Sequence, residues 1–523
     1  MTYNSIYFIL FLAVFLSIYF IVPRVGMRQG VILIGNFVFY RFAGGLNCLL
    51  IIIGTSVIVY FISRWMEKIY SGYDSKKESL SKKDQTAALA EYKKRCKKVL
   101  ILGLCFVLGI LIYIKTGNLL GWYEVTAIAD LRVKTIIVPL GVSYYTFSAV
   151  GYMLDVYWRK TKCERNYLKL LMCMTFFPII VEGPISKYNN LIKQFNELPK
   201  FNYERACYGF QLIIWGEIKK TVVADRLIIY SNYVFSNLDA FAGMEVLIAI
   251  LFNAIAIYAD FSGCMDIVCG VAQVMGISLE PNFRQPFFSK SAAEFWRRWH
   301  ITLGAWFKDY VYMPIAMSPK FMKVGFEVRK RFGNRAGQIV SSAVPLAIVW
   351  ILTGLWHGTG ANYLVWGCYW GMLIILSNAF SKELTKLTEI LHINTDTFAY
   401  SLFQMIRTFA IFCIGRIFTA KDTVGGAVQI IKRLFAQARL WVLFDDSLYN
   451  YGLDQKDFYV ALFGVIIIWL VDIFQQKCSI RENISKQPIV LRWTIYYGAI
   501  MFLLIFGLWG TSYNASSFIY GNF

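Results

Sequence analysis

Apolar runs follow one another along the whole chain, and short polar segments separate them. A helix needs about 20 residues to cross the ~30 Å hydrocarbon core of a bilayer, and many of these runs approach that length. The pattern therefore predicts about 11 to 14 membrane helices. The runs are Ile6–Val22, Val31–Phe42, Leu46–Ser63, Val99–Ile114, Ile136–Val156, Tyr167–Ile180, Tyr208–Trp215, Met244–Tyr258, Val340–Leu355, Ala361–Leu376, Tyr400–Phe418, Phe458–Phe474 and Thr494–Leu508.

Helices are the expected building block, because a backbone in lipid must satisfy its own hydrogen bonds. The runs lack the alternating ten-residue pattern of an outer-membrane barrel. Residues 281–335 differ, with short aromatic and basic pieces that Pro286 and Pro314 interrupt. Such pieces are typical of re-entrant or surface-lying helices. We expect an all-α polytopic fold, a single membrane domain over residues 1–523, with a core region at 281–358.

Charge supports this organisation. Residues 64–98 hold eleven Lys/Arg against five Asp/Glu, which predicts a cytoplasmic loop. If the three runs before this loop all span, the N-terminus lies outside. The net charge of +21 gathers between the apolar runs, so we expect no nucleic-acid partner. The first run lacks a basic segment before it, which favours a retained helix over a cleaved signal peptide.

Composition narrows the class further. Hydrophobic residues make up 57% of the chain and charged residues 16%, values typical of a multi-pass membrane protein. Eleven cysteines are scattered without a Cys-x-x-Cys pair, and several lie inside apolar runs. They are expected to be small buried hydrophobic residues.

Two of the three histidines, His300 and His357, lie in very apolar surroundings, whereas His392 lies in a polar loop. Histidine has the side-chain pKa nearest neutrality, and ionisable groups at membrane depth are usually functional. The alternative for His300 is an interfacial helix anchored by tryptophan and arginine. Helical spacing from Glu294 onward places four further candidates near His300, namely Trp296, Arg297, Arg298 and Trp299. A second cluster of polar groups follows in the sequence and adds the candidates Lys308, Asp309 and Tyr310.

His357 ends an apolar run and follows Trp356. Gly358 and Gly360 come next and allow close approach of backbone or substrate, with Asn362 just beyond. A neutral histidine there can take a proton from an incoming hydroxyl, which contributes about 10² to 10⁴ in rate. The alternative is a satisfied polar group at a helix end.

Other chemistries have little support in the sequence. The two histidines lie 57 residues apart with no metal-binding spacing, so we expect no metal. No phosphate-binding loop, dinucleotide fingerprint or serine nucleophile elbow occurs, so we expect no bound cofactor. The acids Asp155, Asp260 and Asp266 lie in or near apolar runs. We expect them to support the histidine segment, through Arg297, Arg298 or Lys308, rather than to catalyse.

Taken together, the motifs resemble those of the membrane-bound O-acyltransferase family, in its bacterial, alginate O-acetyltransferase-like branch. The resemblance covers most of the chain. It rests on Val138–Phe147 with Asp155–Tyr157, Glu182–Ile185, Tyr258–Gly263, Asn282–Pro286, Phe295–Leu303, Leu355–Gly358 and Phe518–Phe523.

The resemblance implies a plasma-membrane enzyme of a bacterium that moves an acyl group, most simply acetyl from acetyl-CoA, toward a hydroxyl of a cell-surface or exported polysaccharide. It implies that His357 is the principal catalytic histidine, that His300 assists, and that an extracytoplasmic partner protein completes the transfer. Lys308 replaces the arginine usual in the family, and Ile315-Ala-Met317 replaces a common Leu-Gly-Gly. Both changes bear on substrate details rather than on the histidines.

Three alternatives are also compatible with the sequence. A D-alanyl transferase of the teichoic-acid type would take its acyl group from a carrier-protein thioester. A transporter or flippase would use the histidines and acids as a proton relay and would consume no thioester. A structural scaffold would tolerate loss of His357.

Overall fold

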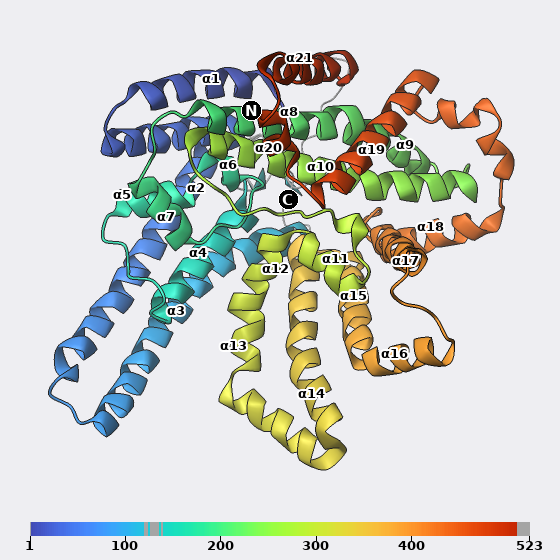
Figure 1. Ribbon diagram of the computed structural model, residues 1–523. Coiled ribbons are helices and arrows are strands. Elements are labelled where there is room, and N and C mark those ends of the chain that lie inside the picture. Colours follow the sequence, from blue (N-terminus) through green and yellow to red (C-terminus); the bar gives the residue numbers. More distant parts are fainter. Residues whose placement is uncertain (1, 120–123, 126–134, 137–139, 510–523) are drawn as a thin grey trace. The chain divides into compact units, whose positions relative to one another are not determined.

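The computed structural model describes residues 2–119, 124–125, 135–136 and 140–509, and nearly all of this chain is helical (Figure 1). The start of the predicted run Ile136–Val156 and the motif Phe518–Phe523 include residues outside the described part. Two short strands, β1(Glu124–Val125) and β2(Thr135–Ile136), pair in parallel. The all-α fold class is confirmed.

The elements of the first half of the chain are α1(Ile6–Ile21), α2(Val25–Lys77), α3(Lys82–Leu119), α4(Val142–Tyr157), α5(Tyr167–Met174), α6(Phe177–Ile180), α7(Tyr188–Asn196), α8(Tyr203–Glu217), the π-helical turn η1(Ile218–Ala224), α9(Asp225–Ser236) and α10(Met244–Met275). The second half contains η2(Pro286–Phe288), α11(Ala292–Arg298), α12(Ile301–Phe307), the π-helical turn η3(Lys308–Tyr312), α13(Met313–Ala316), α14(Pro319–His357), α15(Ala361–Ala379), α16(Ser381–Ile390), α17(Phe398–Ile417), α18(Val424–Ala436), η4(Leu440–Leu443), η5(Asp446–Asn450), α19(Gln455–Gln475), α20(Ile480–Ser485) and α21(Ile489–Phe506).

Within the described residues, seven helices are long and apolar enough to cross a membrane, or eight if α15 and α16 form one bent span. This number is lower than the 11 to 14 expected from the runs. The runs Val31–Phe42 and Leu46–Ser63 belong to one helix, α2, which Gly45 interrupts with a φ of 85°. The run Tyr208–Trp215 lies in a 15-residue helix, and that helix is shorter than a span needs.

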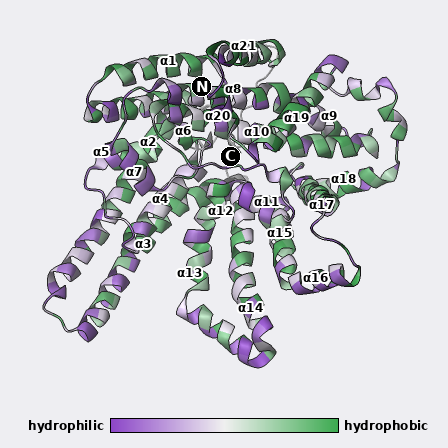
Figure 2. Ribbon diagram, in the orientation of Figure 1, coloured by the Kyte–Doolittle hydropathy of each residue, from purple (hydrophilic) through white to green (hydrophobic). Residues whose placement is uncertain are grey.

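The contacts between Cα atoms divide the chain into two compact units, one with residues 1–209 and 268–280, the other with residues 210–267 and most of 281–519. In the first unit, α2 and α3 form a long antiparallel pair whose tip carries the basic stretch 64–98. This tip is hydrophilic (Figure 2), as its charge predicts. The expected single domain stays a prediction.

The second unit holds the region around both histidines. Residues 286–316 form a series of short helices, as expected for the first part of the stretch 281–335, whereas the end of that stretch belongs to the long helix α14. Helix α14 begins at Pro319, well before the predicted start of its apolar run. Its first part is hydrophilic (Figure 2), and Gly333 breaks the helix with a φ of 87°. From there α14 runs beside α15 and ends at His357 (Figure 1).

Candidate functional site

Local hydrogen bonds set where the His300 segment begins. The Ser291 hydroxyl accepts a bond from the Glu294 N–H at 3.2 Å, which caps the start of α11. The Glu294 carboxylate accepts a bond from the Lys290 N–H at 2.9 Å and pairs with Arg298 at 2.6 Å. Serine at the cap with glutamate three residues later is a strong helix-start signal. Glu294 and Arg298 therefore serve to form the helix, and their ion pair lies on one face of α11.

His300 lies at a sharp turn between α11 and α12. Its backbone has φ 47° and ψ 51°, in the left-handed region that side chains other than glycine enter at a cost. Asn282 holds the turn: its carbonyl accepts the Ile301 N–H at 3.0 Å, and its side-chain oxygen accepts the N–H and hydroxyl of Thr302 at 3.0 and 2.8 Å. Asn282 Oδ1 also lies 3.4 Å from His300 Nδ1. These bonds aim the imidazole.

The His300 side chain is almost completely buried, at 2% exposed. The edge of the Phe261 ring meets it, with centroids 4.8 Å apart and planes at 88°. Burial lowers the pKa of His300 from about 6.5 to about 3, because the protein interior disfavours the charged form. His300 is thus a neutral imidazole throughout the physiological pH range.

His357 is the last residue of α14 and is 8% exposed. The rings of Trp356 and Trp366 lie 4.7 and 4.8 Å from its ring. A Cβ on the following residue, Gly358, would come within 2.2 Å of the Tyr363 ring. Only glycine therefore allows the chain to leave α14 so close to α15.

Tight packing of α14 on α15 places His357. A Cβ on Gly354 would lie 2.6 Å from the Tyr363 carbonyl oxygen and 3.4 Å from the Gly367 Cα. The two glycines let the helix backbones approach closely, as small residues do at membrane helix interfaces. Asn362, 1% exposed, donates from Nδ2 to the carbonyls of Phe418 and Lys421 at 3.2 and 3.0 Å. It ties the start of α15 to the segment after α17.

One aromatic cluster contacts both histidines. The Trp356 ring lies 6.2 Å from the His300 ring as well as 4.7 Å from that of His357. Trp366, which contacts His357, also contacts Trp296 at 5.7 Å. Trp296 packs in turn on two further indoles at 4.8 and 5.1 Å, those of Trp350 and Trp370. Two residues 57 positions apart therefore share one apolar, aromatic site.

The remaining predicted residues lie in different settings. Trp299 is 4% exposed and belongs to the aromatic packing, where it stacks on Phe295 at 5.4 Å. Tyr310 is buried against Trp306 at 5.2 Å. Arg297 and Lys308 are exposed, and Asp309 is half-buried. The structure therefore supports the tryptophans as part of the site more directly than it supports these charged residues.

The intramembrane acids have partners other than those expected. Asp260 pairs with Lys220 at 2.6 Å, and Asp266 with Lys219 at 2.6 Å. Lys220, completely buried, also pairs with Asp225 at 2.9 Å. The two lysines come from η1, so they fasten this turn to α10. Helix α10 also carries the Phe261 ring that contacts His300. The expectation that the acids support the histidine segment stays a prediction.

Sequence reasoning missed Asn282 and the two lysines as supporting residues. Asn282 follows Pro281 in a segment without periodicity, so its side chain had no predicted direction. The lysine pair could have been found from the sequence, because two adjacent lysines at the end of an apolar run are rarely buried without acidic partners. Among the described residues, no group of three or more His, Cys, Asp or Glu could hold a metal ion.

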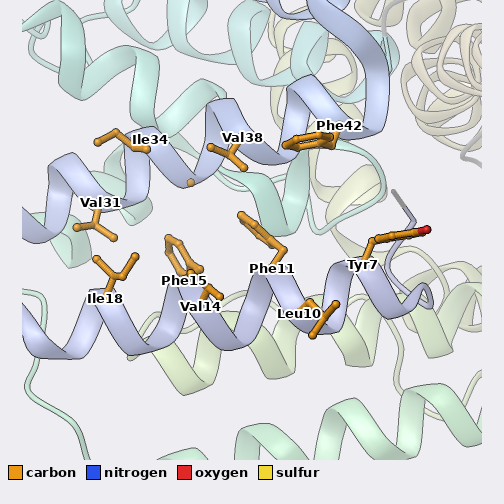
Figure 3. Close-up of a pocket in the computed structure, with 11 residues that line it drawn as sticks. Tyr7, Leu10, Phe11, Val14, Phe15, Ile18, Val31, Ile34, Val38 and Phe42 are labelled. Carbon is orange, nitrogen blue, oxygen red and sulfur yellow. The ribbon is translucent and has the colours of Figure 1, made fainter.

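A separate, apolar groove lies in the first unit. It has a volume of about 760 Å³ between α1 and the first part of α2 (Figure 3). Its walls are aliphatic and aromatic, with Phe11, Phe15 and Phe42 among them. Tyr7 is the one titratable residue among those that line it, and the other lining residues are apolar or glycine.

Comparisons with known proteins identify the family to which the chain is related. The profile of the membrane-bound O-acyltransferase family matches residues 165–326, which include His300. "Probable alginate O-acetylase AlgI" of Pseudomonas syringae pv. tomato is 27% identical over 439 residues, 83% of this chain and 74% of that protein. The peptidoglycan O-acetyltransferase of Helicobacter pylori is 26% identical over 314 residues, 55% and 56% of the two chains. The teichoic acid D-alanyltransferase of Bacillus subtilis is 30% identical over 288 residues, 54% of this chain and 69% of that protein.

The chain therefore belongs to the membrane-bound O-acyltransferase family, and it is a multi-pass membrane enzyme that transfers acyl groups. Within the family it is similar to the alginate O-acetylases across most of its length.

Proposed function

We propose that the protein transfers an acetyl group from acetyl-CoA to a hydroxyl of a cell-surface or exported polysaccharide, directly or through a partner protein. The observation that carries this proposal is the sharing of one buried, aromatic site by His300 and His357. A thioester needs no further activation, so a neutral base and exclusion of water suffice for the transfer.

In the proposed reaction His357 accepts the proton of the acceptor hydroxyl. The hydroxyl oxygen forms a bond to the acyl carbon, the carbon–sulfur bond breaks, and the proton passes from His357 to the leaving thiolate. No electron is gained or lost. His300, fixed by Asn282 and neutral because it is buried, orients donor or acceptor rather than supplying charge.

The relatives support an acceptor of this kind. Their names specify alginate, peptidoglycan and teichoic acid, all polymers of the bacterial cell surface. All are bacterial proteins, which favours a bacterial plasma membrane as the location. The transporter and scaffold alternatives lose support, because neither uses an acyl donor.

A second candidate is D-alanyl transfer from a carrier-protein thioester. It is favoured by the Bacillus subtilis relative, which has a higher identity than the Pseudomonas syringae protein over a shorter stretch. The two reactions differ in the acyl group and its carrier, and the same pair of histidines could serve both.

Thioester consumption by the purified protein in nanodiscs tests the proposal. Wild type and His357→Ala are compared with acetyl-CoA and with a D-alanyl carrier thioester, with cell-surface polymer extracts as acceptors. Turnover of acetyl-CoA that the mutant abolishes supports the proposal. Turnover of the carrier thioester alone moves the assignment to D-alanylation, and turnover of neither contradicts both.

A further inference from the structure

The first part of α14, residues 319–332 (the amphipathic segment), has one cationic face and one apolar face. It carries five Lys/Arg and a single acid, Glu327. Helical spacing gathers four of the five cations on one side and apolar side chains on the other. The cationic face holds Lys320, Lys323, Lys330 and Arg331, and the apolar face holds Phe321, Met322, Val328 and Phe332. A basic amphipathic helix of this kind is typical of helices that lie on a membrane surface.

Two glycines hold the amphipathic segment against the rest of α14. A Cβ on Gly325 would lie 2.5 Å from Ser341 Oγ, and a Cβ on Gly337 would lie 2.6 Å from the Cβ of Arg329. The chain turns between these contacts at Gly333, whose φ of 87° favours glycine over other residues. The amphipathic segment therefore folds back on α14 and does not continue its axis.

Part of the apolar surface of the amphipathic segment stays uncovered. Met322 and Phe326 are 55% and 63% exposed, and they lie four residues apart on one side of the helix. Lys323 and Lys330, both exposed, lie beside them. Apolar side chains bordered by lysines fit the boundary between lipid headgroups and acyl chains, because the apolar groups insert while the ammonium groups stay at the headgroups.

Charge indicates on which side of the membrane the amphipathic segment lies. Residues 319–338 carry six Lys/Arg and one Glu, and they lie in a helix that is long and apolar enough to cross a membrane. Cytoplasmic segments next to membrane helices are rich in lysine and arginine. The segment therefore lies on the cytoplasmic side, where anionic lipids give the membrane a negative surface potential.

The neighbouring helix pair changes direction at the same level. Helix α16 bends away from α15 by 61°. Arg335, two residues after the turn at Gly333, donates to the Ala379 carbonyl at 2.7 Å and pairs with Glu383, so it joins α14 to this bend. Two helices that turn at one level are expected where both leave the hydrocarbon core, which places the amphipathic segment at the membrane surface.

We infer that the amphipathic segment binds anionic phospholipids of the cytoplasmic leaflet. Met322 and Phe326 insert among the acyl chains, and the four cations of the charged face contact the lipid phosphates. Each lysine or arginine near an anionic membrane surface strengthens binding about fivefold, so the four together give a strong preference for anionic over neutral lipid. This contact is independent of the reaction at the histidines and holds whatever acyl donor the enzyme uses.

Amide hydrogen exchange of the full-length protein in nanodiscs tests this contact. In nanodiscs that contain phosphatidylglycerol, the amides of residues 320–332 should exchange several-fold more slowly than in nanodiscs of phosphatidylcholine alone. A rise in salt from about 0.1 M to about 1 M should reduce this difference, because the Debye length falls from about 10 Å to about 3 Å.

A charge variant and a matched control locate the effect. Replacing the four cations of the charged face by glutamine should abolish the difference between the two lipids, in the variant Lys320→Gln/Lys323→Gln/Lys330→Gln/Arg331→Gln. The control removes the same charge from four exposed lysines at the tip of the α2–α3 pair, and it should keep the difference, in the variant Lys76→Gln/Lys77→Gln/Lys82→Gln/Lys83→Gln.

An apolar variant separates insertion from simple attraction of charge. Met322→Ser/Phe326→Ser keeps every cation and alters only exposed side chains, so the fold should be unchanged. We expect most of the protection by phosphatidylglycerol to be lost. Full protection in this variant would overturn the insertion of the two side chains. Exchange in α15 should be the same in all variants, which checks that each one is folded.

Three other results would overturn the proposal. Equal exchange of the amphipathic segment in the two lipids would leave its basic face to a soluble acidic partner. Loss of the difference in the control variant as well would show that only the net charge of the protein matters. Protection by inorganic phosphate in nanodiscs of phosphatidylcholine would replace the lipid surface by a site for a free anion.

Discussion

The two histidine segments use opposite devices to hold the same kind of side chain. His300 lies in a strained left-handed turn that Asn282 fixes by hydrogen bonds. His357 lies at a regular helix end, and glycines allow its surroundings to close around it. The first arrangement fixes the ring through hydrogen bonds and leaves it 2% exposed, whereas the second fixes the ring through close packing and leaves it 8% exposed. This difference favours His357 as the proton acceptor and His300 as the orienting group.

The largest effect is expected from His357→Ala, which removes the proposed base. A positioned base contributes about 10² to 10⁴ in rate, so kcat for acyl transfer should fall by at least about 100-fold. His300→Ala should raise KM more than the His357 variant does and should lower kcat less. Steady-state kinetics on both variants measure the difference, and equal losses in kcat would remove the division of roles.

Gly358→Ala tests the close packing beside His357. The new Cβ would meet the Tyr363 ring at 2.2 Å, so Tyr363 and the His357 turn must move. We expect a loss of activity of about tenfold or more and a loss of stability of about 1 to 3 kcal/mol. Gly425→Ala, where the nearest atom is 3.9 Å away, is the matched control and should retain full activity. Normal activity in Gly358→Ala would show that this turn can relax freely.

Asn282→Ala tests the turn at His300. The variant removes the acceptor of two bonds from Thr302, each worth about 0.5 to 1.5 kcal/mol, and frees a strained backbone. We expect lower thermal stability and a several-fold lower kcat/KM. Thr302→Val removes only the hydroxyl bond and should have a smaller effect. Melting in detergent and steady-state kinetics are measured for both variants. A loss in Asn282→Ala no larger than that in Thr302→Val would contradict the role of Asn282 in holding the turn.

The smallest effect concerns pH. Burial lowers the pKa of His300 to about 3 in the folded protein, while the unfolded chain binds a proton below about pH 6.5. The contribution of the neutral His300 side chain to the free energy of unfolding is therefore complete above pH 6.5. It declines by about 1.4 kcal/mol per pH unit as the pH falls toward 3. His300→Gln removes this group, so its melting temperature should fall less steeply between pH 7 and pH 5. The same slope of melting temperature against pH in wild type and in His300→Gln would contradict the buried, neutral state of His300.

Much of the candidate site could be predicted from the sequence. Histidines are rare in this chain, and two of them lie among tryptophans and glycines, a setting that indicates function by itself. The helix start at Ser291 also follows from local signals, because capping involves residues only three positions apart. The basic stretch 64–98 was recognisable for the same reason, since a run of charge is a local property.

The tertiary structure decided the rest. Trp356 contacts both histidines, Lys220 pairs with Asp260 and Asn282 holds Thr302, and all three depend on chain segments that are distant in sequence. Uniformly apolar runs do not show which face packs on protein and which faces lipid, because both environments favour the same side chains. The sequence by itself determined an all-helical membrane protein with two candidate histidines. Only the fold decided that these histidines share a site, because packing across the chain brings together what local patterns leave apart.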